Sequence, residues 1–303
     1  MYATVPPFLK WAGGKRWLVA THPEILPAKP RRLIEPFLGG AAVFFHLSPS
    51  QAVLSDTNAA LIACYEAIHD DWRAVQTHLH YFAKKHSDEY YYVARGTRYR
   101  NRFQEAARFI YLNRTCFNGI YRENLRGEFN VPRGSKNSIM FDTDDFSLVS
   151  RHLNIAEIRC CDFEETINQA GSDDFIFADP PYTVRHNNNG FIKYNQKIFC
   201  WNDQIRLFNS VKAAAFRGAK CLVMNADHSS IRKLYEGLGV VRRLSRSSVV
   251  GASAQSRGRY SEAAIIIGYD WRTEGARPPA PRPRGKPEGE AIAGARGRIS
   301  AIC

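Results

Sequence analysis

Four consecutive residues, Asp179-Pro180-Pro181-Tyr182, combine the groups that chemistry on a planar amine would need. They end an apolar run over 174–179 that predicts a buried strand. A carboxylate and a backbone carbonyl can accept the two N–H groups of an exocyclic base amine, and the prolines fix the backbone that carries the carbonyl. Tyr182 offers a face on which an unstacked base can lie. The alternative is a strand that simply ends in a proline turn.

A second group of candidates surrounds a glycine turn. The segment Glu35-Pro-Phe-Leu-Gly-Gly-Ala-Ala42 follows a predicted strand, and glycines there let a cofactor approach the backbone at a helix N-terminus. Asp56 ends the next predicted strand, where a carboxylate can bind ribose hydroxyls. Because the segment is not G-x-G-x-x-G, it could be only a tight turn, and Asp56 or Asn58 could be a helix cap.

A third segment, Phe8-Leu-Lys-Trp-Ala-Gly-Gly-Lys15, resembles a phosphate loop only superficially. It lacks the G-x-x-x-x-G-K-[ST] pattern, in which backbone amides and a lysine hold the phosphates of a nucleotide. This difference argues against an ATPase.

The hydrophobic pattern predicts a parallel sheet that would bring these segments together. Strands and helices alternate over 32–38, 41–47 and 52–56, and again over 155–161, 163–170, 174–179, 202–217, 221–226 and 229–238. Segments 240–248 and 262–269 predict a closing antiparallel pair. The economical fold is α/β, a parallel sheet with helices on both faces.

The alternation is lost over 59–154. Helices are predicted over 61–69, 72–85 and 103–112, followed by turns and short strands over 116–138, with turns at Asn118-Gly119 and Arg126-Gly127. We expect an inserted, mainly helical domain that carries specificity. From residue 272 proline, arginine, glycine and alanine dominate, so a disordered basic tail over 272–303 is expected, either inert or adding nonspecific attraction to DNA.

Composition narrows the class of protein. The chain has 303 residues and a formal net charge of +13, which fits either a polyanionic partner or a well-solvated basic surface. No apolar run approaches the roughly 18–20 residues of a membrane span, and no signal peptide layout is present, so a cytoplasmic protein is expected. The seven cysteines include no C-x-x-C pair, which predicts neither a metal site nor a disulfide framework.

These motifs, together with the segment YLNRTCFNGIYRENLRGEFNVP over 111–132, resemble the Dam family of DNA adenine-N6 methyltransferases from about Phe8 to Tyr269. The resemblance implies a Rossmann-like methyltransferase sheet with 1–58 as the cofactor-binding half, 59–154 as an inserted DNA target-recognition domain and 155–271 as the catalytic half. It implies transfer of a methyl group from S-adenosylmethionine, leaving S-adenosylhomocysteine, to a flipped adenine in double-stranded DNA, within GATC or another GA-containing site. No metal and no obligate protein partner are expected, and the expected state is a monomer.

The resemblance also implies roles for individual residues. The residues implied to be catalytic are Asp179, Pro180, Pro181 and Tyr182. Those implied to bind the cofactor are Trp11, Lys15, Glu35, Phe37, Gly39, Asp56, Asp162, Phe163 and Asp179, with Glu35 and Gly39 on the methionine side, Asp56 on the ribose, and Asp162 and Phe163 near the cofactor adenine. Those implied to contact DNA are Lys10, Phe117, Asn118, Ile120, Arg122, Asn124 and Pro132.

Several alternatives stay open. Arg122 could read guanine O6 and N7, contact a phosphate, or form a surface ion pair with Glu123 or Glu128. The residues Arg-Gly-Ser-Lys-Asn-Ser after Pro132 and Thr183-Val-Arg-His-Asn-Asn-Asn-Gly190 differ from the family pattern, which leaves open the reading of the second half-site and closure over the substrate. The substrate could instead be cytosine N4 or a base in RNA, or the chain could bind DNA with an inactive methyltransferase fold.

Overall fold

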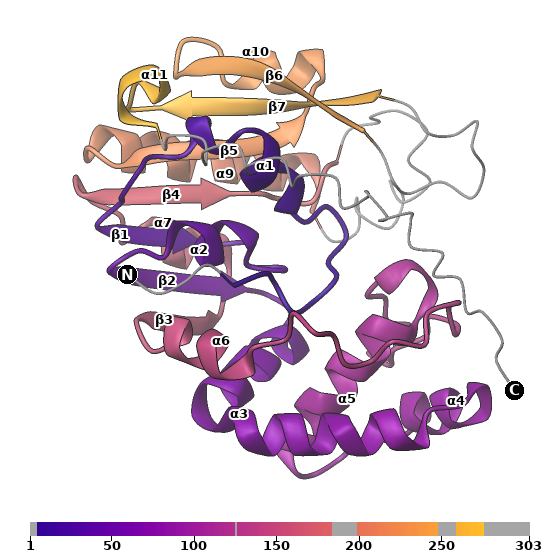
Figure 1. Ribbon diagram of the computed structural model, residues 1–303. Coiled ribbons are helices and arrows are strands. Elements are labelled where there is room, and N and C mark those ends of the chain that lie inside the picture. Colours follow the sequence, from indigo (N-terminus) through magenta and orange to yellow (C-terminus); the bar gives the residue numbers. More distant parts are fainter. Residues whose placement is uncertain (1–4, 125, 184–198, 248–258, 276–303) are drawn as a thin grey trace, which may run out of the picture.

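A mixed β-sheet forms the centre of the computed structural model, which describes residues 5–124, 126–183, 199–247 and 259–275 (Figure 1). Within these residues seven strands follow the order β3-β2-β1-β4-β5-β7-β6. They are β1 (Arg32–Glu35), β2 (Gln51–Asp56), β3 (Ala156–Cys160), β4 (Asp174–Ala178), β5 (Lys220–Ala226), β6 (Val240–Ser247) and β7 (Arg259–Ile267). β1 to β5 are parallel, and β7 is antiparallel to both β5 and β6. The predicted α/β sheet and its closing antiparallel pair are therefore confirmed.

Helices cover both faces of this sheet. They are α1 (Arg16–Thr21), α2 (Ala42–Leu47), α3 (Ala59–Lys85), α4 (Asp88–Gly96), α5 (Arg102–Thr115), α6 (Phe146–Leu153), α7 (Phe163–Ile167), α9 (Trp201–Phe216), α10 (Ser229–Leu234) and α11 (Trp271–Glu274), with single turns η1 (Pro23–Ile25) and η2 (Phe117–Gly119). Successive strand residues point to opposite faces. Leu33 accordingly packs in the core under α1, α2 and α3, while Ile34 packs in the core under α7 and α9.

The order of the strands reverses between β1 and β4. From β1 the chain continues to β2 and β3 on one side, whereas β4 and β5 lie on the other side. In open α/β sheets, ligands bind outside the carboxyl ends of the strands at such a switch point. Glu35 is the last residue of β1 and Asp179 directly follows β4, so both carboxylates stand at this edge.

Helices α3 to α6 connect β2 to β3, and Figure 1 shows α3, α4 and α5 beyond the β3 edge of the sheet. The two helices predicted over 61–69 and 72–85 form the single element α3, interrupted only at Asp71, whose φ of −150° is not helical. Helix α4 was not predicted, although Ser87 caps it by accepting the Tyr90 N–H at 3.0 Å. Helix α6 was not predicted either, and Asp145 caps it in the same way.

The two predicted turns in the connecting region are present. Gly119 and Gly127 have φ values of +66° and +70°, which glycine adopts without steric cost. Around the second turn, Glu123 and Phe129 form an antiparallel bridge, and Cys116 bridges Arg133 further back. The segment that follows α5 is therefore folded back on itself and held to the end of that helix.

The described part of the chain adds three smaller observations. Helix α11 extends to Glu274, three residues into the segment predicted to be a tail, and the rest of that segment, 276–303, lies outside the described residues. Among the helices described, none is long and apolar enough to cross a membrane. The cysteines that the structure describes are all free thiols: Cys64, Cys116, Cys160, Cys161, Cys200 and Cys221.

Candidate functional site

Four polar side chains meet at the carboxyl edge of the sheet. Lys15, which directly precedes α1, is 3% exposed, and its Nζ lies 2.7 Å from Oδ2 of Asp179 and 2.8 Å from the Gly13 carbonyl oxygen. The same Nζ lies 3.5 Å from Oε2 of Glu262 on β7. Tyr182 donates its hydroxyl to that Oε2 at 2.7 Å, and the Lys15 ammonium stands 5.4 Å from the centre of the Tyr182 ring. Segments far apart in sequence thus form one charged cluster.

A buried amide network holds the segment that follows Asp179. Gln204 on α9 donates to the Thr183 hydroxyl at 3.1 Å, and Asn225 on β5 donates to the Gln204 side-chain oxygen at 2.9 Å. All three side chains are buried. Because buried polar groups that satisfy one another restrict the local geometry, this network fixes the backbone immediately after Tyr182.

Glu35 lies beneath the same edge, fully enclosed by the protein. Burial raises the pKa of its carboxyl well above the usual range, the nearby Asp179 charge raises it further, and a hydrogen bond from the Phe44 backbone opposes both effects. Its Oε2 has no hydrogen-bond partner among the described residues. Since an orphaned buried carboxylate oxygen is costly, this atom is suited to a donor that a ligand brings.

The glycine turn after β1 is tightly packed. Gly39 has a φ of +45°, and a Cβ on it would lie 2.7 Å from Cδ1 of Trp11. Its carbonyl accepts the Tyr65 hydroxyl at 3.1 Å, and its N–H donates to Oδ2 of Asp56 at 3.2 Å. Asp56 also accepts the Asn58 N–H at 3.0 Å, while Asn58 itself caps α3. Burial raises the pKa of Asp56, because the folded chain leaves its charge poorly solvated.

An aromatic cluster borders the turn on the side of α7. The rings of Phe37 and Phe163 stack with their centres 5.4 Å apart, and the Phe199 ring packs edge-on against Phe37 at 5.6 Å. Asp162 caps α7 by accepting the Glu164 N–H. Arg206 on α9 pairs with Asp162 at 2.9 Å and lies over the Phe163 ring at 4.9 Å. Arg206 therefore fixes both residues of the Asp-Phe pair.

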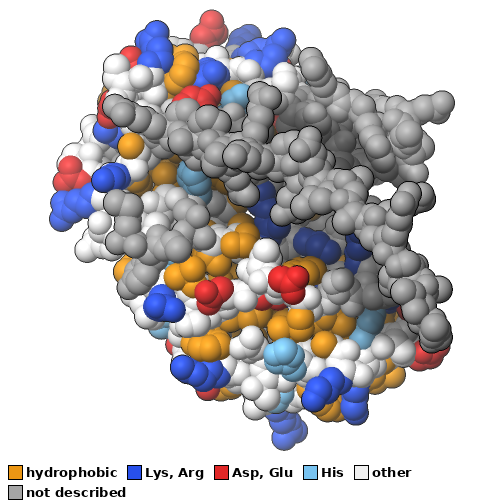
Figure 2. All heavy atoms as spheres, in the orientation of Figure 1, with side chains coloured by type: hydrophobic (Ala, Val, Ile, Leu, Met, Phe, Trp, Pro, Cys, Tyr) orange, Lys and Arg blue, Asp and Glu red, His pale blue; other side chains and the backbone are white. Residues whose placement is uncertain are grey.

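A pocket of about 260 Å³ adjoins the glycine turn and joins the two predicted sets of residues. It is lined by Pro7, Leu9, Lys10, Trp11, Gly14, Arg16, Gly40, Ala42 and Asn118. Trp11 belongs to the predicted cofactor set, whereas Lys10 and Asn118 belong to the predicted DNA set. Figure 2 shows a hollow in the face seen here, with Lys and Arg side chains visible inside it.

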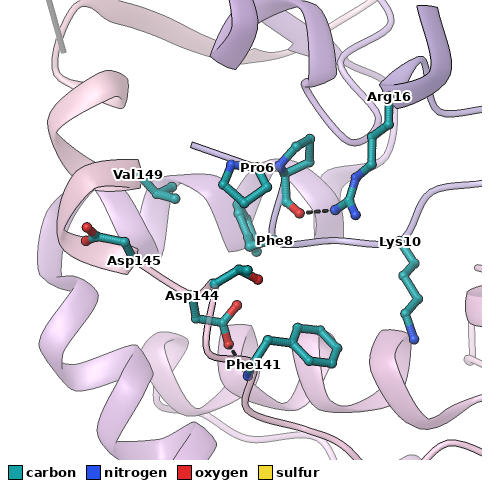
Figure 3. Close-up of a pocket in the computed structure, with 10 residues that line it drawn as sticks. Pro6, Phe8, Lys10, Arg16, Phe141, Asp144, Asp145 and Val149 are labelled. Atoms are coloured by element: carbon teal, nitrogen blue, oxygen red, sulfur yellow. Dashed lines mark hydrogen bonds between the residues drawn. The ribbon is translucent and has the colours of Figure 1, made fainter. Parts of the chain in front are cut away.

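Lys10 is anchored by its backbone, and its half-buried side chain places Nζ 3.5 Å from the Arg114 carbonyl oxygen and 5.7 Å from the centre of the Phe141 ring. Its N–H donates to Oδ1 of Asn113 on α5 at 2.8 Å, and the Asn113 amide donates back to the Lys10 carbonyl at 2.7 Å. A second pocket of about 250 Å³ lies alongside, with Lys10 and Arg16 on one side and Asp144 and Asp145 on the other (Figure 3). Partial burial and the charges of Lys136 and Arg114 lower the pKa of Lys10.

The region after α5 presents the remaining predicted DNA contacts in different ways. Phe117 is 50% exposed, and its backbone N–H is fixed at 2.9 Å by the carbonyl of Pro132, which is itself exposed. Ile120 is half-buried. Asn118 is exposed and has a φ of +55°, a backbone conformation that few residues other than glycine adopt. Phe117 and Asn118 therefore project from a rigidly held turn.

Arg122 and Asn124 lie in the folded-back segment. Arg122 is exposed and donates from Nε to the Asn130 side chain at 2.7 Å, and no ion pair with Glu123 or Glu128 is found among the described residues. Asn124 accepts the Arg126 and Glu128 N–H groups and donates to the Glu128 carboxylate at 2.8 Å. The Asn124 side chain is thus occupied within its own turn, whereas the far end of Arg122 faces solvent.

The structure therefore brings most of the predicted residues together in three groups, around Asp179, around Gly39 and around Lys10, whereas Arg122 and Asn124 make side-chain contacts within the folded-back segment. Sequence reasoning missed four side chains that connect or support these groups: Glu262, Asn113, Arg206 and Tyr65. Of these, Glu262 had a signal, since a carboxylate opens the otherwise apolar strand predicted over 262–269. Asn113 lies within the segment quoted for the family resemblance, but its contact with Lys10 depends on the fold.

Comparison with known proteins finds a matching family model and several similar proteins. The sequence model of the D12 class N6 adenine-specific DNA methyltransferases matches residues 11–249. The chain is 33% identical over 272 residues to the type II methyltransferase M1.LlaDCHI of Lactococcus lactis subsp. cremoris, covering 87% of this chain and 95% of that protein. It is 33% identical over 268 residues to the type II methyltransferase M.MjaIII of Methanocaldococcus jannaschii, covering 81% and 93%. It is 30% identical over 273 residues to the DNA adenine methylase of Haemophilus influenzae, covering 86% and 93%.

Proposed function

Because the chain belongs to the D12 class of N6 adenine-specific DNA methyltransferases, we propose that it methylates N6 of a flipped adenine in duplex DNA, within GATC or another GA-containing site. The observation that carries this proposal is the position of Asp179-Pro180-Pro181-Tyr182 at the carboxyl end of β4, beside Glu35 at the end of β1. A carboxylate, a fixed carbonyl and an aromatic face meet there at the switch point of the sheet.

The residues around the glycine turn fit S-adenosylmethionine, the methyl donor that the family implies. Glu35 supplies a buried oxygen that lacks a partner within the described chain, suited to the methionine ammonium group. The tight turn at Gly39 lets a ligand approach the backbone beside Trp11, and Asp56 presents a carboxylate for ribose hydroxyls. Phe37 and Phe163 offer aromatic faces near Asp162 for the adenine ring. S-adenosylmethionine supplies a methyl group attached to a positively charged sulfur.

The segment around Asp179 would orient the target base. Asp179 and the Pro180 carbonyl accept the two N–H groups of the adenine amine, which favours the geometry in which the nitrogen lone pair is available. Tyr182 stacks on the extruded ring. Flipping the base out of the duplex costs a few kcal/mol. The chain then contributes positioning and electrostatics, and its cysteines take no part because the amine itself is the nucleophile.

The connecting region 59–154 would recognise DNA as a domain inserted between the two halves of the catalytic domain, 1–58 and 155–271. Phe117 and Asn118 project from a turn whose backbone is fixed by a hydrogen bond to Pro132. They fill or face the space that the flipped base leaves in the duplex. Lys10, Ile120, Arg122, Asn124 and Pro132 read base edges or fix the backbone of the site. Of these, Asn124 acts through the shape of its turn, because its side chain is engaged with Glu128. The net charge of +13 favours attraction to the phosphates.

Mapping of modified bases tests the proposal. Purified protein is incubated with S-adenosylmethionine and unmethylated genomic DNA, and modified bases are located by single-molecule sequencing. We expect N6-methyladenine in one short sequence context, and almost none from Asp179→Ala, a variant that should still fold. Methylation of cytosine N4 or of RNA, or intact cofactor binding with no methylation of any nucleic acid, would refute the proposal. Substantial activity of Asp179→Ala would refute the role of the carboxylate.

A further inference from the structure

Glu262 is a buried carboxylate at the site to which none of the roles above is assigned. It is 1% exposed and lies on β7 opposite Ala226, the last residue of β5, so it stands at the carboxyl edge of the sheet. Its Oε2 accepts the Tyr182 hydroxyl at 2.7 Å and lies 3.5 Å from Nζ of Lys15. Glu262 therefore contacts both the ring proposed to stack on the base and the cation that sits on Asp179.

Lys15 and the target amine share one carboxylate, that of Asp179. Lys15 Nζ lies 2.7 Å from Oδ2 of Asp179, within a charge-assisted hydrogen bond. An adenine amine is a neutral donor, so it makes a weaker bond to a carboxylate than an ammonium does. While the ammonium neutralises this carboxylate, the amine gains little from it, so a full bond to the amine favours movement of the ammonium away from Asp179. An ammonium as buried as that of Lys15 is strongly destabilised unless another negative charge receives it.

We propose that Glu262 is a positioning residue that receives the Lys15 ammonium when the target amine takes Asp179. This inference rests on the proposed function. A movement of Nζ by about 1 Å would bring it within hydrogen-bonding distance of Oε2 of Glu262. The Gly13 carbonyl, 2.8 Å from Nζ, offers a contact that the ammonium keeps during this movement.

Tyr182 holds the Glu262 carboxylate beside Lys15. Its hydroxyl donates to the same Glu262 oxygen that faces Lys15. The carboxylate is thereby held in place before the ammonium arrives, because the aromatic ring and the carboxylate restrain each other. Glu262 thus links the stacking surface, the cation and the acceptor of the target amine without touching the reacting atoms.

The test compares DNA binding to two duplexes with S-adenosylhomocysteine present, so that no methyl transfer occurs. Both carry the sequence found by mapping, one with adenine at the target position and one with purine, which lacks the exocyclic amine. The readout is the ratio of the two Kd values. Glu262→Gln keeps the size of the side chain and removes its charge. We expect it to shift the ratio against adenine about tenfold, equivalent to about 1.4 kcal/mol, with affinity for the purine duplex nearly unchanged.

Glu157→Gln is the matched control, because Glu157 lies on β3 at the far edge of the sheet and pairs only locally with Arg159. It should leave the ratio unchanged. An unchanged ratio in Glu262→Gln, or equal weakening of both duplexes, would overturn the inference. If Glu262→Gln does not fold, Glu262→Asp is measured instead, since it keeps the charge but withdraws it from Lys15, and the same two outcomes decide. Failure of the proposed function is separate, because then the wild-type protein would form no N6-methyladenine.

Discussion

Replacing Gly39 with alanine tests whether the glycine turn is shaped for a ligand and for Trp11 together. At a φ of +45° an alanine adopts left-handed backbone geometry, which costs about 1–2 kcal/mol. The new Cβ would also lie 2.7 Å from Cδ1 and 3.0 Å from Nε1 of Trp11. The Trp11 ring stacks on Tyr121 with centres 5.7 Å apart, so it cannot move without disturbing a second aromatic ring.

Overpacking of this kind costs about 1–3 kcal/mol, so Gly39→Ala should lower the free energy of unfolding by about 2–5 kcal/mol in all. Gly237→Ala is the matched control. Gly237 has a similar φ of +75°, but a Cβ there meets no atom within 4 Å. That control should lose only the backbone term, about 1–2 kcal/mol. The difference between the two variants then isolates the contact with Trp11.

Urea denaturation followed by tryptophan fluorescence measures both losses, and isothermal titration with S-adenosylmethionine measures cofactor affinity. Gly39→Ala should bind the cofactor at least about tenfold more weakly than wild type, while Gly237→Ala should bind it normally. Equal stability losses in the two variants, together with unchanged cofactor affinity in Gly39→Ala, would refute the reasoning. In that case the turn would accommodate a side chain, and glycine would be needed at position 39 only for its left-handed backbone conformation.

Three further substitutions test the site. Burial raises the pKa of Glu35, so the folded state binds the carboxyl proton more tightly than the unfolded state does. Proton binding therefore stabilises the folded state at low pH. This stabilisation is lost as the pH rises from about 4.3, the usual Glu pKa, through the raised value. Glu35→Gln should therefore be more stable than wild type near pH 8 but not near pH 4 in urea titrations, while binding S-adenosylmethionine more weakly; an equal stability difference at both pH values would contradict this. Asn113→Ala removes both hydrogen bonds to the Lys10 backbone and should weaken DNA binding in fluorescence anisotropy while cofactor affinity is kept. Asp144→Ala leaves the fully buried Arg114 without its bidentate partner, so urea denaturation should show a loss of about 3–5 kcal/mol; a loss below about 1 kcal/mol would mean that water reaches the guanidinium.

The sheet and its functional edge could be predicted from the sequence because the strands are short apolar runs with turn residues between them. The run ending at Asp179 is buried at every position of β4, as its composition indicates. A parallel arrangement then places Asp179 and Glu35 at one edge without any knowledge of individual contacts. The sequence also predicted the closing antiparallel pair over 240–248 and 262–269, after the helix predicted over 229–238.

Helices α4 and α6 of the connecting region were not predicted, although their buried residues are spaced about one turn apart, as Phe146, Val149 and Leu153 are on α6. Helix α4 carries three consecutive tyrosines, of which only Tyr91 is buried, together with Ala94 one turn later. The adjacent tyrosines hide this spacing in the sequence, because the fold decides which ring is buried, and each of the two helices is too short for its pattern to repeat many times. In α3, the break in helical geometry at Asp71 divides the element into two helical stretches, which the sequence predicted as two helices over 61–69 and 72–85.

The contacts of Glu262 could not be predicted because they depend on register. Tyr182 and Glu262 are 80 residues apart, and Lys15 and Asp179 are 164 residues apart. Whether a strand residue faces the site or the opposite core depends on which residue it pairs with, and a shift by one position would turn Glu262 to the other face. Pairing of Glu262 with Ala226 sets this outcome, and nothing local in the sequence encodes it.

The segment after Pro132, whose sequence departs from the family pattern, is held firmly to the rest of the protein. Arg133 turns inward, with its Nε 3.1 Å from Asp88 and its Nη2 3.2 Å from His86. The Gly134 N–H donates to the Thr115 carbonyl at 2.8 Å, so the segment is fixed to the end of α5. Because the guanidinium of Arg133 is used inside the protein, it is not available to a phosphate. Any reading of the second half-site by this segment therefore falls to the exposed residues over 135–138.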